Sequence, residues 1–207
     1  MPLLSGSVSL FRYRVVEAPA REETFDALRT RLAEQAFVPI ERETGEQERA
    51  AGWVELGQPE AFPATAKPLF YAGDLVLSWR IDQIRVPGSL VKSGLDDWQR
   101  GFVERRGRKP SKREKTEQKE FVLRELRKQA FVTSRTHDVR WSIGQDEVQV
   151  WSTSLKVVDE VVVALEEGLS LVLRPTGPGA RWEDAELPMD VLKPTAALFG
   201  EEVIGGI

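Results

Sequence analysis

Lysine and arginine crowd one stretch of this sequence, and their spacing could support the binding of a polyanion. Eight of them fall within residues 105–119. Lys112, Lys115 and Lys119 are three and four residues apart, so on a helix they would share one face. A row of cations of this kind can neutralise successive phosphates of a nucleic acid, which makes the affinity fall steeply with salt. This stretch is therefore a candidate DNA-binding surface.

The charge of the whole chain hides this concentration. The 207 residues include 29 Lys/Arg and 33 Asp/Glu, for a net charge of -4. Residues 105–128 hold eleven basic and four acidic residues, a local charge of +7, which leaves -11 for the rest. A basic segment in an acidic chain favours a local anionic partner. The alternative is a solvated helix face, and pairs such as Glu120 with Arg124 fit that alternative.

An aromatic residue, Phe131, ends the basic segment and is flanked by Lys128 and Arg135. Such a ring can stack on bases or wedge between them, although burial under a sheet is the commoner role and the one we expect. The candidate DNA-binding residues are Arg105, Arg106, Arg108, Lys109, Lys112, Arg113, Lys115, Lys119, Arg124, Lys128 and Phe131.

Catalytic chemistry has little support in the composition. Cysteine is absent, which excludes disulfides, thiol catalysis and cysteine-ligated zinc. The single histidine, His137, excludes multi-histidine metal sites, and we expect it to be a structural residue at a strand edge. No glycine-rich nucleotide-binding motif follows a strand.

Acidic residues offer one weak nuclease signal. Glu117 and Lys119 form the Glu-x-Lys arrangement of metal-dependent nucleases, but they fall in a predicted helix instead of a strand. The adjacent acidic pairs Asp96-Asp97 and Asp159-Glu160 would point apart on a helix and are expected at the surface. We therefore predict no catalytic residue, no metal and no cofactor.

The periodicity of apolar residues predicts a mixed α+β fold. A period of two predicts strands over residues 5–16 and 74–86, a hairpin within 138–150 and a last strand over 169–173. A period of 3.6 predicts helices over 21–36, 112–130 and 155–167, and a weaker one through 91–102. With a short apolar strand at 52–54, the order is β-α-β-β-α-α-β-β-α-β. This order favours a largely antiparallel sheet with packed helices.

Local signals refine the helix ends. Ser111 and Glu114 have the spacing of a capping box. Glu22 and Glu23 are expected in the first turn of the first helix, where carboxylates suit the helix dipole. Gly168 is expected to end the helix that begins at residue 155.

The chain divides into four expected parts. They are an N-terminal α+β part (1–88), a projecting helical basic segment (89–134), a β-β-α-β part that completes the core (135–175), and a C-terminal tail (176–207). No stretch has the ~18 apolar residues of a membrane helix. The first sixteen residues indicate a strand and not a signal peptide, so we expect a cytoplasmic protein.

A set of short segments resembles the RdgC family of bacterial recombination-associated DNA-binding proteins over roughly residues 5–175. The segments are Phe11–Arg14, Ala36-Phe37-Val38-Pro39, Gly52-Trp53-Val54, Val86-Pro87-Gly88-Ser89-Leu90-Val91-Lys92, Lys115-Thr116-Glu117, Gln129-Ala130-Phe131 and Trp141. Their order and spacing fit the family along most of the chain.

The resemblance implies an α+β homodimer closed into a ring around duplex DNA. It also implies sequence-independent binding through a positively charged interior, association with the nucleoid, and opposition to RecA filament function during recombination. No established catalytic residue comes with it. The positions to which the DNA-binding role extends are Lys112, Arg113, Lys115, Lys119, Lys128 and Phe131. Family members usually continue beyond the point matching Pro175, so an open dimer or a clamp is the alternative to a closed ring.

Three functions therefore remain in competition. The first is a non-enzymatic duplex-DNA-binding protein that modulates homologous recombination. The second is a magnesium-dependent nuclease that uses Glu117 and nearby acids. The third is a protein-interaction module whose charged helix binds an acidic partner instead of DNA.

Overall fold

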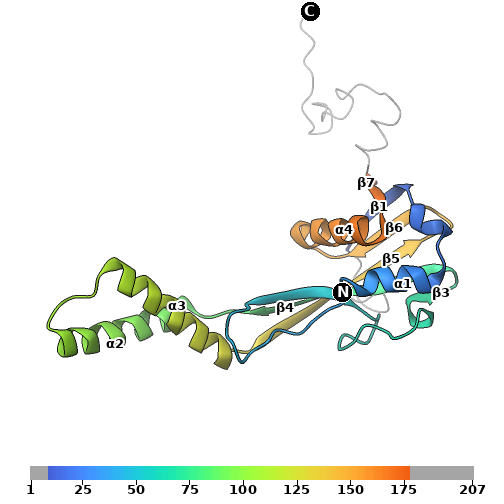
Figure 1. The fold of residues 1–207 in the computed structure, drawn as a ribbon. Coiled ribbons are helices and arrows are strands. Elements are labelled where there is room, and N and C mark those ends of the chain that lie inside the picture. The colour runs from blue at the N-terminus through green and yellow to red at the C-terminus, as the bar shows by residue number, and fades with distance from the viewer. Residues whose placement is uncertain (1–8, 178–207) are drawn as a thin grey trace, which may run out of the picture.

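One curled antiparallel sheet runs through the protein in the computed structural model, which describes residues 9–177 (Figure 1). Its seven strands are β1 (Leu10–Glu17), β2 (Arg49–Val54), β3 (Phe70–Tyr71), β4 (Asp74–Ile84), β5 (Val132–Ser142), β6 (Glu147–Trp151) and β7 (Val172–Pro175). The order across the sheet is β2-β4-β5-β6-β1-β7, with β3 paired to β4. The N-terminal β1 thus lies between β6 and β7, so the two ends of the chain complete one sheet.

Two helices cover one face of this sheet. They are α1 (Phe25–Ala33) and α4 (Leu155–Leu169), which contact each other. Leu28, Leu32 and Leu165 enter one hydrophobic cluster with Trp53 and Trp141, and all five are almost fully buried. Tryptophans in phase with apolar strand neighbours were expected in the core, and Trp79 and Trp141 confirm that expectation.

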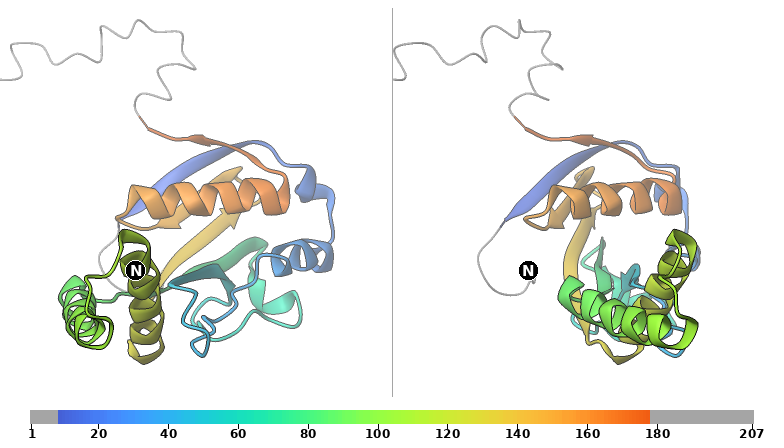
Figure 2. Two further views of the ribbon diagram at one scale, coloured as in Figure 1. Left: turned by 60° about the vertical axis from the view of Figure 1, so that its left-hand side comes forward. Right: turned by 90° about the vertical axis from the view of Figure 1, so that its left-hand side faces the viewer.

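Two further helices form a hairpin that extends away from the sheet (Figures 1 and 2). They are α2 (Gly88–Arg106) and α3 (Lys112–Gln129), inserted between β4 and β5 and in contact with each other. We call residues 88–129 the helical hairpin. Its position follows from topology, because β4 leads into α2 and α3 returns directly into β5.

Both faces of β4 are buried, which simple alternation does not predict. Leu75, Leu77 and Trp79 point into the core, as the period of two indicates. On the opposite face, the Ser78 hydroxyl donates to the Asp138 carboxylate at 2.7 Å, and Arg80 donates two hydrogen bonds to Asp82 at 2.8 and 2.9 Å. Buried polar groups need such partners, so these pairs let a polar face lie away from water.

The predicted fold class, α+β with a largely antiparallel sheet, is confirmed. The predicted elements occur in the predicted order, but the two-residue strand β3 was not expected, and β7 begins three residues later than predicted. Further errors lie at helix ends. Residues Pro19–Glu22 form a short 3-10 helix, and α1 begins at Phe25 with Thr24 as its N-cap, so Glu22 and Glu23 precede its first turn. Helix α4 extends to Leu169 and ends where Ser170 adopts the left-handed conformation. Gly168 therefore lies within the helix and does not end it. The predicted C-terminal tail (176–207) lies outside the described residues, except for Thr176 and Gly177.

Within the described residues, no helix combines the length and apolar character needed to cross a bilayer.

Gly52 is a position where a side chain cannot fit. Strand β2 lies against the segment after α1, where Trp53 donates its N–H to the Gln35 carbonyl at 2.9 Å and Phe37 donates to the Trp53 carbonyl at 3.0 Å. A Cβ on Gly52 would lie 2.5 Å from the Phe37 Cα and 2.6 Å from its nitrogen. The obstacle is backbone, which cannot move aside as a side chain can.

We predict that Gly52→Ala lowers the free energy of unfolding by about 1–3 kcal/mol, the usual cost of overpacking. Denaturant unfolding measures the effect. Gly144→Ala is the matched control, because a Cβ there meets nothing within 4 Å, and it should stay within about 0.5 kcal/mol of the parent. Equal stability of the two variants would contradict the proposed close approach.

Candidate nucleic-acid interface

The turn at the tip of the helical hairpin is built from its own sequence. Helix α2 ends at Gly107, whose φ of 64° is the left-handed conformation that glycine adopts at no steric cost. Helix α3 begins with the predicted capping box. The Ser111 hydroxyl accepts from the Glu114 N–H at 3.3 Å, and the Glu114 carboxylate accepts from the Ser111 N–H at 2.7 Å. The tip therefore places the start of α3 at the far end of the hairpin.

Close helix packing supports the rest of the hairpin. Gly94 of α2 faces Val122 of α3, and an alanine Cβ at Gly94 would lie 3.0 Å from a Val122 methyl group. The glycine that weakens the helical pattern of α2 thus permits the two helices to approach. Val122 also belongs to the apolar line predicted for α3, which packs on α2 and not on the sheet.

Some cations of the segment 105–128 are neutralised by nearby carboxylates. Arg108 pairs with Glu114 at 2.7 Å, Arg113 with Glu117 at 2.8 Å, and Lys128 with Glu125 at 2.6 Å. The hydrogen bond from Arg108, followed by that from the Ser111 N–H, lowers the pKa of Glu114 to about 2. Hydrogen bonding to Glu114 and Glu117 raises the pKa of Arg108 and Arg113 respectively.

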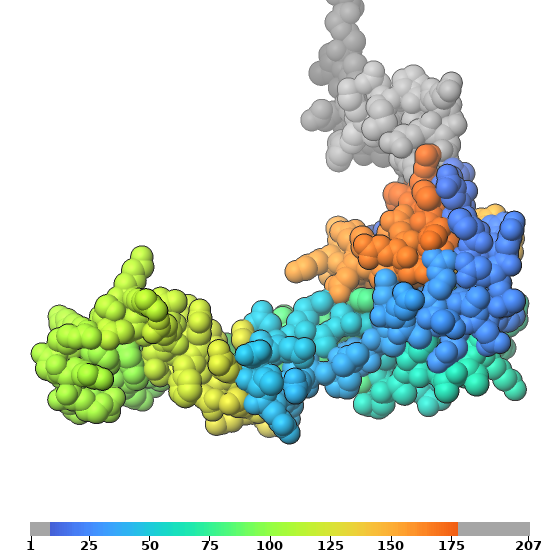
Figure 3. Space-filling view, viewed as in Figure 1, coloured from blue at the N-terminus to red at the C-terminus, as the bar shows by residue number. Residues whose placement is uncertain are grey.

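The remaining cations of the segment are exposed and form no ion pair with any described residue. Apart from Arg127, which pairs with Glu48, they are Arg105, Arg106, Lys109, Lys112, Lys115, Lys119 and Arg124. Because α3 is helical throughout, Lys112, Lys115 and Lys119 share one face, as their spacing predicts. In the space-filling view the hairpin is a separate projection, so a bulky ligand can reach it (Figure 3).

A loop that sequence reasoning treated only as polar holds the base of α3. The Arg42 guanidinium donates to the carbonyls of Lys128 and Ala130 at 3.2 and 3.1 Å, and Arg127 pairs with Glu48 at 2.5 Å. Gly45, at a φ of 66°, lies so close to the carbonyl of Arg124 that a side chain would collide. In the sequence, Gly45 in an otherwise polar loop was the feature that could have indicated this close contact with α3.

Phe131 is not buried, contrary to expectation. Its side chain is 90% exposed. The reason is its position between the end of α3 and the start of β5, where Ala130 has already turned the chain into an extended conformation. The exposed ring lies beside the base of the cationic helix, which keeps it among the candidate DNA contacts.

Two of the acidic residues singled out in the sequence form ion pairs. Glu117 is exposed on α3 and paired with Arg113, and Glu160 pairs with Arg49 at 2.5 Å. No group of three His, Cys, Asp or Glu side chains among residues 9–177 is placed to hold a metal ion.

His137 lies on β5 opposite Trp79 and is half-buried. Pairing of β5 with β6 begins two residues later, at Val139. The edge of β5 that faces β6 is therefore not paired in the sheet at His137. Burial is the main cause that lowers the pKa of its imidazole, and the charge of Arg135 lowers it further. Both effects disfavour the charged form of this imidazole.

Exposed cations on a projecting hairpin, carried by an α+β fold, form a candidate surface for polyanions. A comparison with protein families shows the particular group: a family model described as "Putative exonuclease, RdgC" matches residues 8–180. This range is most of the 207 residues, and the chain belongs to the RdgC family. At the level of the family, this indicates a recombination-associated DNA-binding protein. The comparison with curated proteins found no match.

The capping box gives the tip a pH dependence. The pKa of Glu114 is lowered in the folded state, so its stabilising effect is complete above about 4.5 and is lost as the pH falls toward about 2. We predict that amides in the first turn of α3 lose protection from hydrogen exchange over this range, after correction for intrinsic rates. In Glu114→Gln this loss should be absent, while Glu120→Gln, on the same helix, should keep it. A pH-independent first turn in the parent protein would refute the role of Glu114.

Proposed function

We propose that this protein binds duplex DNA without sequence preference through the helical hairpin, and that it modulates homologous recombination without catalysing a reaction. The observation that carries the proposal is the set of seven exposed cations that form no ion pair with described residues. Like charges held this close repel one another, and a polyanion relieves that repulsion while releasing its own counterions.

The dimensions of α3 suit a duplex. Its 18 residues span about 27 Å at 1.5 Å per residue. That is the length of about eight nucleotides along one strand at 3.4 Å each. The row Lys112, Lys115 and Lys119 covers about half of this length, so each ammonium group can meet a different phosphate.

Contacts of this type would bind DNA without sequence preference. Lysine and arginine side chains on phosphates fix position but read no base edge. The acidic remainder of the chain, which carries -11 outside residues 105–128, disfavours DNA elsewhere on the surface. Phe131 adds an aromatic face that can stack on any base.

Occupation of duplex DNA would give the protein its role in recombination. A protein that covers DNA denies the same stretch to a RecA filament, so opposition to RecA needs no direct contact between the two proteins. Family membership supports this role. We further propose a homodimer in the cytoplasm, associated with the nucleoid, and analytical ultracentrifugation measures its stoichiometry.

Reversing the charge of the lysine row should weaken DNA binding. We predict that Lys112→Glu, Lys115→Glu and Lys119→Glu together lower the affinity for all duplexes alike. The slope of log affinity against log salt should become shallower by about 0.9 for each phosphate that the variant no longer neutralises. Fluorescence anisotropy with a labelled duplex measures both quantities.

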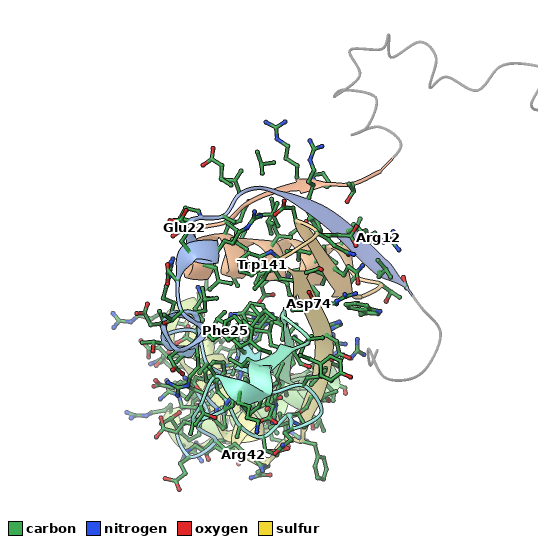
Figure 4. All side chains as sticks on the ribbon, turned by 90° about the vertical axis from the view of Figure 1, so that its right-hand side faces the viewer. Arg12, Glu22, Phe25, Arg42, Asp74 and Trp141 are labelled. Carbon is green, nitrogen blue, oxygen red and sulfur yellow. The ribbon has the colours of Figure 1, made fainter. Side chains whose placement is uncertain are left out.

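The matched control reverses three exposed cations outside the hairpin: Arg12, Lys67 and Arg174. Figure 4 shows Arg12 on β1. This variant has the same net charge as the lysine-row variant and should bind nearly as the parent does. An equal fall in affinity in both variants would show that only net charge matters and would refute the hairpin site.

The printed family description makes a nuclease the competing function. Our proposal predicts that a labelled duplex stays intact with the full chain and Mg²⁺. Degradation that Glu117→Gln abolishes would establish the nuclease and overturn the non-enzymatic proposal. Degradation that the substitution leaves unchanged would exclude Glu117 and indicate another site or a contaminant.

A further inference from the structure

The outward side of β1 and β7 carries arginines that the helical hairpin does not use. The other residues of these two strands pack against the hydrophobic core, and alternate residues of a strand point to opposite faces. Figure 4 shows Arg12 at the margin of the molecule, away from Trp141 in the core. We call this surface the arginine face, and its exposed residues are Arg12, Arg14, Val16, Val172 and Arg174.

The positive charge of the arginine face is only partly balanced. Strand register places Arg14 between Arg174 of β7 and Glu147 of β6, so one carboxylate lies next to a group of three guanidinium groups. Arg12 and Arg174 form no ion pair with any residue of the described range 9–177. Neighbouring like charges raise the local potential, which favours a bound anion.

Apolar surface accompanies these charges. The side chains of Val16 and Val172 are 45% and 41% exposed. A cavity of about 420 Å³ opens beside Arg12, where β1 begins and β7 ends, and Phe11 and Pro175 also line it. A partner that suits this surface therefore combines carboxylates with apolar side chains.

The sequence that follows β7 has this composition. Residues 182–190 contain no lysine or arginine and four carboxylates, for a charge of -4: Glu183, Asp184, Glu186 and Asp190. Trp182, Leu187 and Met189 supply apolar side chains in the same stretch. We call residues 182–190 the acidic segment, which lies outside the described residues.

The acidic segment is attached close to the arginine face. The chain leaves β7 beside Arg12, because the Thr176 N–H donates to the Arg12 carbonyl at 2.8 Å. Glu183 follows Gly177, the last described residue, by six positions, a span of at most about 20 Å. Adjacent strands lie about 4.8 Å apart and alternate residues of a strand about 7 Å apart. All three arginines of the face are therefore within reach of the first carboxylates.

The outer edge of β7 is closed to this contact. The Leu173 N–H on that edge donates to the Glu166 carboxylate at 2.9 Å, and Pro175 has no N–H. An added strand would find no free donor at these two positions. The core-facing side of the sheet is covered by α1 and α4 (Figure 2). The exposed arginine face is the side that remains for a segment leaving β7.

We propose that the arginine face is a binding site for an acidic peptide, and that its occupant is the acidic segment of the same chain. Carboxylates of the segment pair with the guanidinium forks of Arg12 and Arg174, and its apolar side chains cover Val16 and Val172. The short connection holds the segment at an effective concentration of the order of mM, which favours it over a separate acidic protein. The helical hairpin takes no part in this contact, so the inference stands apart from the proposed function.

The absence of cysteine from the sequence permits one nitroxide label in the full chain, at Ala185→Cys. Paramagnetic relaxation of backbone amides then reports which surface the label approaches. The amides of Arg12 and Arg174 should relax severalfold faster than in a baseline chain with the same label and a neutralised acidic segment. The baseline substitutions are Glu183→Gln, Asp184→Asn and Glu186→Gln. Equal relaxation in the two chains would overturn the inference, because attachment alone would then explain the proximity.

Two double variants of the labelled chain locate the binding surface. Arg12→Gln with Arg174→Gln should lower the relaxation of β1 and β7 to the baseline level. The matched control, Arg105→Gln with Arg106→Gln, removes the same charge from the end of α2 and should leave the relaxation unchanged. If the label instead relaxes amides of the helical hairpin, and the control substitutions abolish that effect, the acidic segment binds there and the arginine face is not its site.

Salt and mixed samples test the charge pairing and the source of the segment. At ~1 M salt, where the Debye length is about 3 Å, the relaxation should fall toward the baseline, and an unchanged value would contradict charge pairing. In a mixture of nitroxide-labelled chain and isotope-labelled chain without nitroxide, the amides of β1 and β7 should relax normally. Faster relaxation there would show that a second copy supplies the segment and would overturn the assignment to the same chain.

Discussion

The pairing of β4 with β5 is the interaction on which the rest of the structure depends. Ten residue pairs join the two strands, from Leu75 opposite Trp141 to Ile84 opposite Val132. One end of this ladder lies in the hydrophobic core, where Leu75 and Trp141 are fully buried. The other end carries the helical hairpin, which has no sheet of its own to pack on. This ladder therefore positions the cationic helix relative to the hydrophobic core.

The interactions that stabilise the core end of this ladder differ from those that stabilise the helical hairpin at its other end. The core end uses apolar burial, and the polar face of β4 satisfies its groups through pairs such as Arg80 with Asp82. The hairpin uses local devices instead: a capping box, a glycine contact between helices, and a loop that holds the base of α3. Because these devices neutralise only a few cations, a surplus of positive charge stays exposed. This surplus is the basis of the proposed binding of DNA.

Much of the fold followed from the sequence because its signals are local. The period of two in β4, the 3.6-residue period of α3 and the Ser111–Glu114 box each depend on neighbouring residues. The predicted elements were in the correct order for this reason, although the two-residue strand β3 was missed. Exposure of Phe131 was not predictable, since it depends on where the hairpin leaves the sheet. The gathering of Arg49, Arg85, Arg135 and Lys156 around one cavity was also missed, because these residues are far apart in sequence and the strand register brings three of them together.

The central claim is that the surplus cations of the helical hairpin bind phosphates without reading bases. Its most direct test is the affinity of the full chain for two unrelated duplexes of equal length, titrated from ~50 mM salt upward. The account predicts equal affinities for the two sequences and a steep, parallel decline with salt. A strong preference for one sequence, or an affinity that does not change with salt, would contradict it.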